Sequence, residues 1–263
     1  MKITVFASGS SGNCMLLSGG RTNILIDAGI SARRLTEQLG ECYLSLHDIG
    51  GVLITHEHSD HIMGLKGLLR RSDCPICAPR TVAARLRGML PEIDERLRVV
   101  PVGEDFMLSG LRIRAFHTPH DTPESVGYRV EGDGASFALA TDMGCVTEEV
   151  RQNLLGCGAV LLEANHDEEM LRFGPYPVYL KRRILSSRGH LSNDCCAALA
   201  RELAEHGTGT IVLAHLSRQN NTPDAARRTV AAALEGTETK LLCAPESGCM
   251  ELTVEAGACS VSS

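Results

Sequence analysis

Short apolar runs alternate with turn residues along the N-terminal part of the chain. Three of these runs have the length and composition of strands, and they span residues 2–6, 14–18 and 22–28. Gly19-Gly20 indicates a hairpin turn between the last two runs. The next segment has a helical pattern, for which Ser31 is a suitable cap and Gly40 a suitable end.

The middle of the chain is again mostly strand-like. The strand "GGVLIT" leads into a loop rich in histidine and then into a helix predicted at about 61–70. Pro79 opens a further predicted helix, "PRTVAARLRGML". Additional strands are predicted at "CPICA", "FMLSGLRIRAFHT" and "SVGYRVEGDGASFALATD".

Helices and strands alternate in the C-terminal half. Helices are predicted at "TEEVRQNLLG", "SNDCCAALARELAEHG" and "TPDAARRTVAAALEG", and strands at "GAVLLEA", "GTIVLAH" and "TKLLCA", the last being the final strand. No linker, low-complexity segment or repeat divides the chain. The pattern therefore predicts an α/β (α+β) fold in a single domain over 1–263, with two sheets packed together and helices outside.

Composition is that of a soluble globular protein, with 43% hydrophobic and 22% charged residues in 263. No apolar run approaches the roughly 20 residues that span a bilayer, and the N-terminus lacks the apolar core of a signal peptide. We therefore interpret the eleven cysteines as reduced thiols of a cytoplasmic protein. The net charge of −6 argues against a uniformly basic surface that binds nucleic acid.

The loop "HEHSDH" concentrates residue types that bind divalent metals. His56 and His58 lie two apart, so an extended backbone points both to one side, toward a first metal. Asp60 and His61 follow where the chain turns into the helix, and they can face a second metal nearby. Glu57 is expected to point outward. A solvated loop rich in histidine by chance is a poor alternative at this spacing.

Ligands from one loop cannot enclose two ions, so other strand ends should supply the rest. The residues that follow apolar strands in this way are His117 and His120 in "FHTPHD", Asp142 after "SFALAT" and His215 after "TIVLA". Any one of them alone would more often be an ordinary loop residue. Together with the histidine loop they predict a two-metal site, in which Asp142 is suited to bridge because a carboxylate has two oxygens.

These motifs resemble those of a known family. "THEHSDH" is similar to the HxHxDH signature of the metallo-β-lactamase superfamily, and the match runs nearly end to end. The strings "FASGSSGNCMLL", "LLEANHDEEML", "GPYPVYLKRRILSSRGHLSN" and "LAHLSRQNN" resemble its YycJ/WalJ-type subgroup. The resemblance implies a four-layer αββα sandwich of two mixed β-sheets flanked by helices. It also implies a cytoplasmic exonuclease acting on DNA, related to tRNase Z and the β-CASP nucleases but without their inserted domain or long arm.

By position, the resemblance implies a set of ligands for each metal. His56, His58 and His120 hold the first metal, Asp60, His61 and His215 hold the second, and Asp142 bridges them. His120 is preferred to His117 because the subgroup has a His followed by Asp at this point, as in "PHD" here. Asp27, in "LIDAG", matches an aspartate that supports the superfamily's ligands from behind.

A two-metal site predicts hydrolysis of a phosphodiester. Two close ions can share a hydroxide as the nucleophile and withdraw charge from a phosphoryl oxygen, and Asp60 is expected to orient that nucleophile. His190 in "RGHLSN" is the candidate donor of a proton to the leaving oxygen, with a capping or core histidine as the alternative. Glu163 and His166 follow another apolar strand and are placed either to orient His190 or to serve the core.

A run of basic residues precedes His190 in "YLKRRILSSRGH". Lys181, Arg182, Arg183 and Arg188 form either a phosphate-binding wall, because arginine grips phosphate oxygens in pairs, or a solvated charged face. Ser10, in the loop "SGSSGN", is a further candidate contact for substrate, although this loop also fits a tight turn beneath the metals. With aromatic residues at only 3%, the candidates for base stacking are Phe173, Tyr176 and Tyr179.

The leading interpretation is a binuclear metal-dependent phosphodiesterase, a 5′-to-3′ exonuclease acting on DNA. Imidazole-rich ligands favour zinc, with manganese or iron as alternatives. The alternative functions are a small-molecule hydrolase of thioesters, lactones or cyclic phosphodiesters, which the net charge favours, and a metal-binding regulatory protein. No protein partner and no membrane is indicated. Cys74 and Cys77 form a lone CxxC and are expected to be core or surface thiols rather than a metal site.

Overall fold

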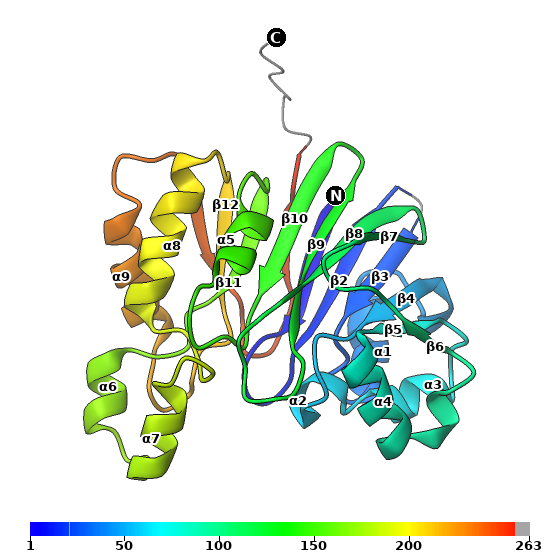
Figure 1. Ribbon diagram of the computed structural model, residues 1–263. Helices are drawn as coiled ribbons and strands as arrows, with labels where there is room; N and C mark the ends of the chain where they lie inside the picture. Colours follow the sequence, from blue (N-terminus) through cyan, green and yellow to red (C-terminus); the bar gives the residue numbers. More distant parts are fainter. Residues whose placement is uncertain (21, 256–263) are drawn as a thin grey trace.

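Two seven-stranded sheets lie face to face in the computed structural model, which describes residues 1–20 and 22–255 (Figure 1). The first sheet contains β1 (Lys2–Ala7), β2 (Cys14–Gly19), β3 (Thr22–Ile26), β4 (Ile49–Leu53), β5 (Ile76–Ala78), β6 (Leu97–Val99) and β14 (Met250–Thr253). The second contains β7 (Asp105–Leu108), β8 (Leu111–His117), β9 (Val126–Gly132), β10 (Ala135–Ala140), β11 (Ala159–Glu163), β12 (Thr210–Ala214) and β13 (Lys240–Cys243). The strand orders are β14-β1-β2-β3-β4-β5-β6 and β13-β12-β11-β10-β9-β8-β7.

Both sheets are mixed, as the sequence predicted. In the first, β14, β1, β2 and β3 pair antiparallel and β3 to β6 pair parallel. In the second, β7 to β10 pair antiparallel and β10 to β13 pair parallel. Neighbouring parallel strands end at the same edge of a sheet. The loops after β3 and β4 and those after β10, β11 and β12 therefore gather at the lower edge in Figure 1.

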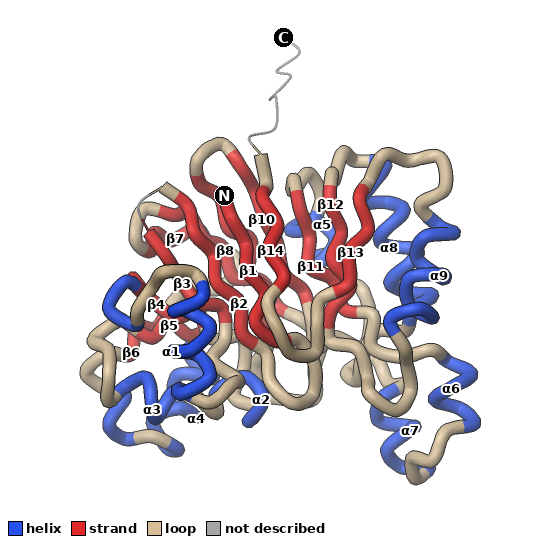
Figure 2. The backbone as a smooth tube through the Cα atoms, turned by 180° about the vertical axis from the view of Figure 1, so that it is seen from behind, coloured by secondary structure: helices blue, strands red, loops and turns tan. Residues whose placement is uncertain are grey.

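Helices cover the outer face of each sheet, which gives four layers (Figures 1 and 2). The helices are α1 (Ala32–Glu41), α2 (Ser59–Ile62), α3 (Leu65–Leu69), α4 (Arg80–Met89), α5 (Glu148–Leu154), α6 (Glu168–Phe173), α7 (Val178–Ile184), α8 (Asn193–Glu205) and α9 (Pro223–Ala233), with 3₁₀ turns at Leu46–Asp48 and Pro91–Ile93. One buried cluster lies between the sheets and draws on both, with Ile24 from the first and Tyr128 and Phe137 from the second. The predicted αββα sandwich is confirmed.

The helix predicted at 61–70 is wrong in outline, because the chain forms two short helices there, α2 and α3. Gly64 stands at the break, where its N–H donates to Ala28 O over 2.7 Å. A Cβ at Gly64 would approach Ile30 O to 2.2 Å, so only glycine fits. The cap at Ser31 is confirmed, since its side chain accepts a hydrogen bond from Arg34 N, but α1 runs past Gly40.

Four helices and strands escaped prediction. β6, a strand of three residues, forms the edge of the first sheet opposite β14. β14 is a short strand at the edge of the first sheet, so "TKLLCA" is not the final strand. The helices α6 and α7 lie between β11 and α8 and project beyond the lower edge of the sheets (Figure 1). Among the described residues, no helix has both the length and the apolar character that crossing a membrane requires.

Candidate metal centre

The predicted ligands all follow strands that end at the lower edge. His56 and His58 come three and five residues after β4, and Asp60 and His61 lie on α2. The other positions come from the second sheet, with His120 after β8, Asp142 after β10 and His215 directly after β12. Because these strands end at the same edge, the side chains that follow them meet there, and most of the seven are buried.

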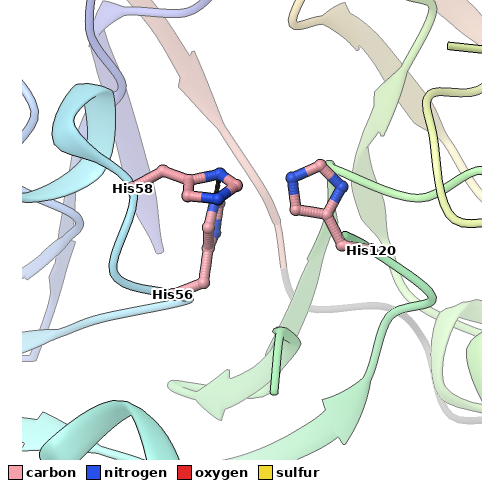
Figure 3. Close-up of side chains that lie close together, drawn as sticks. All are labelled: His56, His58 and His120. Carbon is pink, nitrogen blue, oxygen red and sulfur yellow. Dashed lines mark hydrogen bonds between the residues drawn. The ribbon is translucent and has the colours of Figure 1, made fainter. Parts of the chain in front are cut away.

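The first group consists of His56, His58 and His120. Nε2 of His56 lies 3.1 Å from Nδ1 of His58. The ring of His120 faces this pair from the opposite loop, with its centroid 5.1 Å from each of the other two (Figure 3). By contrast, the side chain of His117 is 56% exposed and lies beside Glu149, away from the group. The structure thus brings together the histidines that the sequence selected.

Asp142 lies between the remaining groups. Its Oδ2 is 3.0 Å from Nδ1 of His215 and 3.5 Å from Nε2 of His61, while Oδ1 is 3.7 Å from Nε2 of His120. Asp60 lies beside them, with Oδ2 3.5 Å from Nε2 of His61. All seven predicted ligands therefore meet at one place.

Several clusters in this place have the composition of a metal site. The ligand atoms lie within 4.8 Å of one another in the groups His56/His58/His120, His56/His61/Asp142 and Asp142/Glu163/His190/His215. Two imidazole nitrogens that face each other can share only one hydrogen, whereas a cation can accept a lone pair from each of them. Imidazole with carboxylate is also the donor set that divalent transition metals take. The residues present fit divalent metal binding.

Asp27 holds His61 from behind, as the resemblance implied. Its Oδ2 is 2.8 Å from Nδ1 of His61, and Oδ1 accepts a hydrogen bond from Thr55 N over 2.9 Å. A carboxylate on one ring nitrogen fixes the orientation of the imidazole and leaves the other nitrogen free to bind a cation. Nε2 of His61 is therefore directed toward Asp142 and Asp60.

Backbone strain is concentrated in the same residues. Asp27, Asp142 and His215 have φ angles of 58°, 57° and 54°. A residue with a side chain loses roughly 1–2 kcal/mol in this left-handed conformation. Such strain persists where the surroundings hold a side chain in a functional position, and here each of the three follows the end of a strand.

Charges inside the site shift the pKa values of its histidines in opposite directions. Burial, helped by the neighbouring His61, holds the pKa of His56 well below its usual value, and burial also lowers the pKa of His120. Although burial opposes it, the carboxylates of Asp27 and Asp142 raise the pKa of His61 to about 9. In the same way Asp142 raises the pKa of His215 to about 10. The carboxylates thus attract positive charge to the side of the site formed by His61 and His215.

His190 borders this cluster. Its Nδ1 lies 2.7 Å from Oε1 of Glu163 and 4.0 Å from Oδ1 of Asp142. Glu163 raises the pKa of His190 against the effect of burial. His166, which shares the motif, is buried with neither ring nitrogen hydrogen-bonded, and burial lowers its pKa to about 4. His190 rather than His166 is therefore the histidine that Glu163 orients.

Four of the predicted substrate contacts differ in how far their side chains are already engaged by the protein. Arg182 is exposed, and Lys181 donates through Nζ to Arg172 O over 2.8 Å. Arg188 donates to His120 O and Thr122 O, both at 2.7 Å, so its guanidinium braces the loop that carries His120. Ser10 is exposed, while the N–H groups of Gly9, Gly12 and Asn13 in the same loop donate hydrogen bonds within the protein.

Asn13 is a site residue that sequence reasoning missed. Its Nδ2 lies 3.0 Å from Nε2 of His61 and donates to Oδ2 of Asp60 over 3.3 Å. Its backbone N–H donates to Asp60 O over 2.7 Å. Asn13 ends the loop "SGSSGN", for which a tight turn beneath the metals was one of two interpretations. The sequence thus pointed to the loop but did not indicate that Asn13 itself contacts the ligands.

The prediction that Glu57 points outward into solvent is wrong. Its side chain is 5% exposed, Oε1 accepts a hydrogen bond from Thr122 over 2.6 Å, and Arg85 lies 3.1 Å away. Alternation does turn Glu57 away from His56 and His58, but Thr122 and Arg85 of α4 cover that side of the loop. Glu57 therefore ties the histidine loop to the loop that carries His120.

Comparisons with known proteins agree with this architecture. The model of the beta-lactamase superfamily domain matches residues 22–216. The chain is 35% identical to exodeoxyribonuclease YycJ of Bacillus anthracis, with 89% of each chain covered. It is 36% identical to exodeoxyribonuclease WalJ of Streptococcus pneumoniae, with 87% of this chain and 86% of the relative covered.

A solved structure shows the same fold. The metallo-beta-lactamase fold protein YhfI of Bacillus subtilis superposes with a TM-score of 0.71 at 16% identity, covering 95% of this chain and 99% of that one. Fold, strand-end ligands and sequence similarity coincide over most of the chain. The chain therefore belongs to the metallo-β-lactamase superfamily of hydrolases, in the group that contains YycJ and WalJ.

Proposed function

We propose that this protein is a metal-dependent phosphodiesterase, an exonuclease that degrades DNA in the 5′-to-3′ direction. The observation that carries the proposal is the position of Asp142, which faces His61, His215 and His120 at once. A carboxylate so placed can serve two cations, as a two-metal phosphodiesterase needs. The two curated relatives named exodeoxyribonucleases support DNA as the substrate.

The proposed site holds two divalent ions, for which zinc suits the imidazole-rich donors best. His56, His58 and His120 would hold one ion, Asp60, His61 and His215 the other, and Asp142 both. When bound, such ions supply Lewis acidity toward a phosphoryl oxygen and activate water near neutral pH.

The protein's own groups handle the protons. Asp60, steadied by Asn13, would accept a hydrogen bond from the attacking water and orient it toward phosphorus. His190 would donate the proton that the departing oxygen needs. Glu163 favours the charged form of His190 and binds its Nδ1, which leaves Nε2 as the proton donor. Lys181, Arg182, Arg188 and Ser10 are the proposed contacts for the DNA backbone.

Two broader assignments rest on the same structure. We propose one domain for the whole chain, because the core between the sheets is built from both. We also propose a cytoplasmic location, because the ten cysteines of the described residues, Cys74 and Cys77 among them, are free thiols. Cys74 and Cys77 are buried, as expected for core thiols.

The test is degradation of DNA by metal-reconstituted protein beside His58→Ala and His190→Ala. The first change should abolish activity and reduce bound metal, because it removes a ligand. The second should slow turnover about 100-fold or more with metal retained, because it removes only the acid. His47→Ala, a change of an exposed histidine outside the site, is the control.

Substrate class and polarity need separate arms. Oligonucleotides blocked at the 5′ end should resist degradation, and those blocked at the 3′ end should not. Wild-type rates in both site variants would refute the mechanism. Hydrolysis of thioesters or lactones with DNA left intact would instead assign the protein to small-molecule hydrolases.

A further inference from the structure

Large apolar side chains are exposed on one projecting segment beside the site. In α6, α7 and the turn between them, Phe173 is 82% exposed, Tyr179 75% and Val178 65%. The chain has five Phe and four Tyr and no Trp, and three of these nine lie at 173–179. Most of the other aromatic side chains are buried in the sheets, so packing does not explain these.

Positive charge dominates this segment after the two glutamates that begin α6, Glu168 and Glu169. Between residues 172 and 188 there are five basic side chains and no acidic one, in a chain whose net charge is −6. Arg182 is exposed one turn from Val178 and beside Tyr179 on α7. Exposed rings interleaved with cations at this density fit a partner that presents both flat apolar groups and negative charge. We call residues 172–188 the basic arm.

The basic arm is joined firmly to the site. Arg183 forms an ion pair with Asp121, whose Oδ1 lies 3.2 Å from Nε2 of His120. At the same end of α7, His190 N donates to Ile184 O over 3.0 Å. Tyr179 and Arg183 are four residues apart on α7 and therefore share one side of the helix. Tyr179 therefore lies on the side of α7 from which Arg183 reaches Asp121, the neighbour of His120.

We propose that the basic arm binds single-stranded DNA next to the site, with bases stacked on Phe173 and Tyr179 and phosphates held by Arg182. Bases of a duplex cover one another's faces, whereas those of a single strand are free to stack on protein rings without regard to sequence. The inference rests on the proposed function and deepens it, because it makes an unpaired strand the form in which DNA approaches the metals.

Binding of a labelled single-stranded oligonucleotide, followed by fluorescence anisotropy, tests the arm. The measurements are made in the His58→Ala protein, which should keep the DNA intact because it lacks a metal ligand. The change Phe173→Ala/Tyr179→Ala should weaken binding about tenfold or more, because stacking is lost. Arg182→Gln should lower the slope of log Kd against log salt by about 0.7, because one phosphate contact is lost. A duplex of equal length should bind weakly and change less than twofold in either variant, in our estimate.

Matched controls separate the arm from a general surface effect. Tyr43→Ala removes an aromatic side chain that is 97% exposed, and Arg80→Gln removes an exposed cation on α4. Neither should alter binding. All these side chains are exposed, so folding should be preserved, and unchanged thermal unfolding verifies it.

A small substrate and a second binding partner separate DNA binding by the basic arm from catalysis at the metal site. Hydrolysis of bis(p-nitrophenyl) phosphate, which is too small to reach the exposed rings of the arm, should be unchanged by Phe173→Ala/Tyr179→Ala in otherwise wild-type protein. Wild-type affinity for single strands in the arm variants would overturn the inference, and so would an equal loss for duplex. Arm-dependent binding to phosphatidylglycerol vesicles in place of DNA would also overturn it. Arm-dependent single-strand binding without cleavage of any DNA would support the arm and refute the nuclease.

Discussion

Oε1 of Glu163 lies 2.7 Å from Nδ1 of His190, and the second oxygen of this carboxylate accepts hydrogen bonds from Met143 N and Leu191 N. Glu163 is fully buried, so its charge is little screened by solvent. Met143 follows Asp142 directly. Glu163 therefore fixes the position of His190, the proposed acid, relative to Asp142, which lies between the two groups of metal ligands.

Replacing Glu163 by Gln should shift the pH dependence of turnover. Glu163 raises the pKa of His190, so the protonated histidine persists to higher pH in the wild type. With the charge removed, that pKa falls, and the alkaline limb of the pH–rate profile should move to lower pH while metal content stays unchanged. Glu41→Gln, an exposed change at the end of α1, should leave the profile in place. An unshifted limb would separate His190 from the proton transfer.

Metal binding should strengthen as pH rises and should release protons. In the protein without metal, the pKa of His61 is about 9 and that of His215 about 10, so both are protonated at neutral pH. A metal ion must displace these protons, since only neutral imidazole is a ligand. Calorimetric titration with zinc in buffers of different ionisation enthalpy measures the protons released. The test covers about pH 6 to 8, where a free imidazole changes its charge. A zinc affinity that stays constant over this range would contradict the assignment of His61 and His215 as metal ligands.

The sequence, with the resemblance that it carries, was sufficient for the sandwich and for the gathering of the candidate ligands, because both leave local signals. Apolar runs predicted the strands, and a His or Asp directly after such a run predicted residues that the structure brings together, such as Asp142 and His215. Glu57 and Asn13 were missed because their contacts are set by distant loops. Glu57 bonds to Thr122, 65 residues away, and Asn13 to His61, 48 residues away.

Short elements were also beyond sequence reasoning. β14 is four residues long with a single buried side chain, and pairing with β1 defines it. α6 and α7 have six and seven residues, and their outward faces mix large apolar side chains with charged ones. An amphipathic pattern cannot mark a helix whose exposed side carries Val178 and Tyr179.

Asn13→Ala should weaken metal binding without unfolding the protein. Nδ2 of Asn13 donates to Oδ2 of Asp60, and its loss frees that carboxylate to rotate. Residues that orient ligands in this way typically change metal affinity by about 10- to 100-fold. Zinc titration against a chromogenic chelator measures the effect. Ser11→Ala, in the same loop but bonded to Glu246, is the control. Equal affinity in both variants would show that Asn13 does not position Asp60.

Glycine 144 should be intolerant of a side chain because the loop before His190 packs directly against it. A Cβ at Gly144 would approach Ser186 O to 2.2 Å and Gly189 N to 2.4 Å, and these contacts are to backbone that cannot rotate away. Gly144 N also donates to Pro119 O, next to His120. Gly144→Ala should therefore lower the free energy of unfolding by about 1–3 kcal/mol, the usual effect of overpacking.

Gly88→Ala provides the comparison, because a Cβ at this position in α4 meets nothing within 4 Å. It should stabilise the protein by up to about 1 kcal/mol through helix propensity, with activity unchanged. Thermal unfolding and DNA degradation, measured together, separate the two positions. If Gly144→Ala displaces the loop 186–189 as the contacts require, its turnover should fall well below that of Gly88→Ala at temperatures where both are folded. Equal turnover would mean that His190 does not depend on this packing for its position.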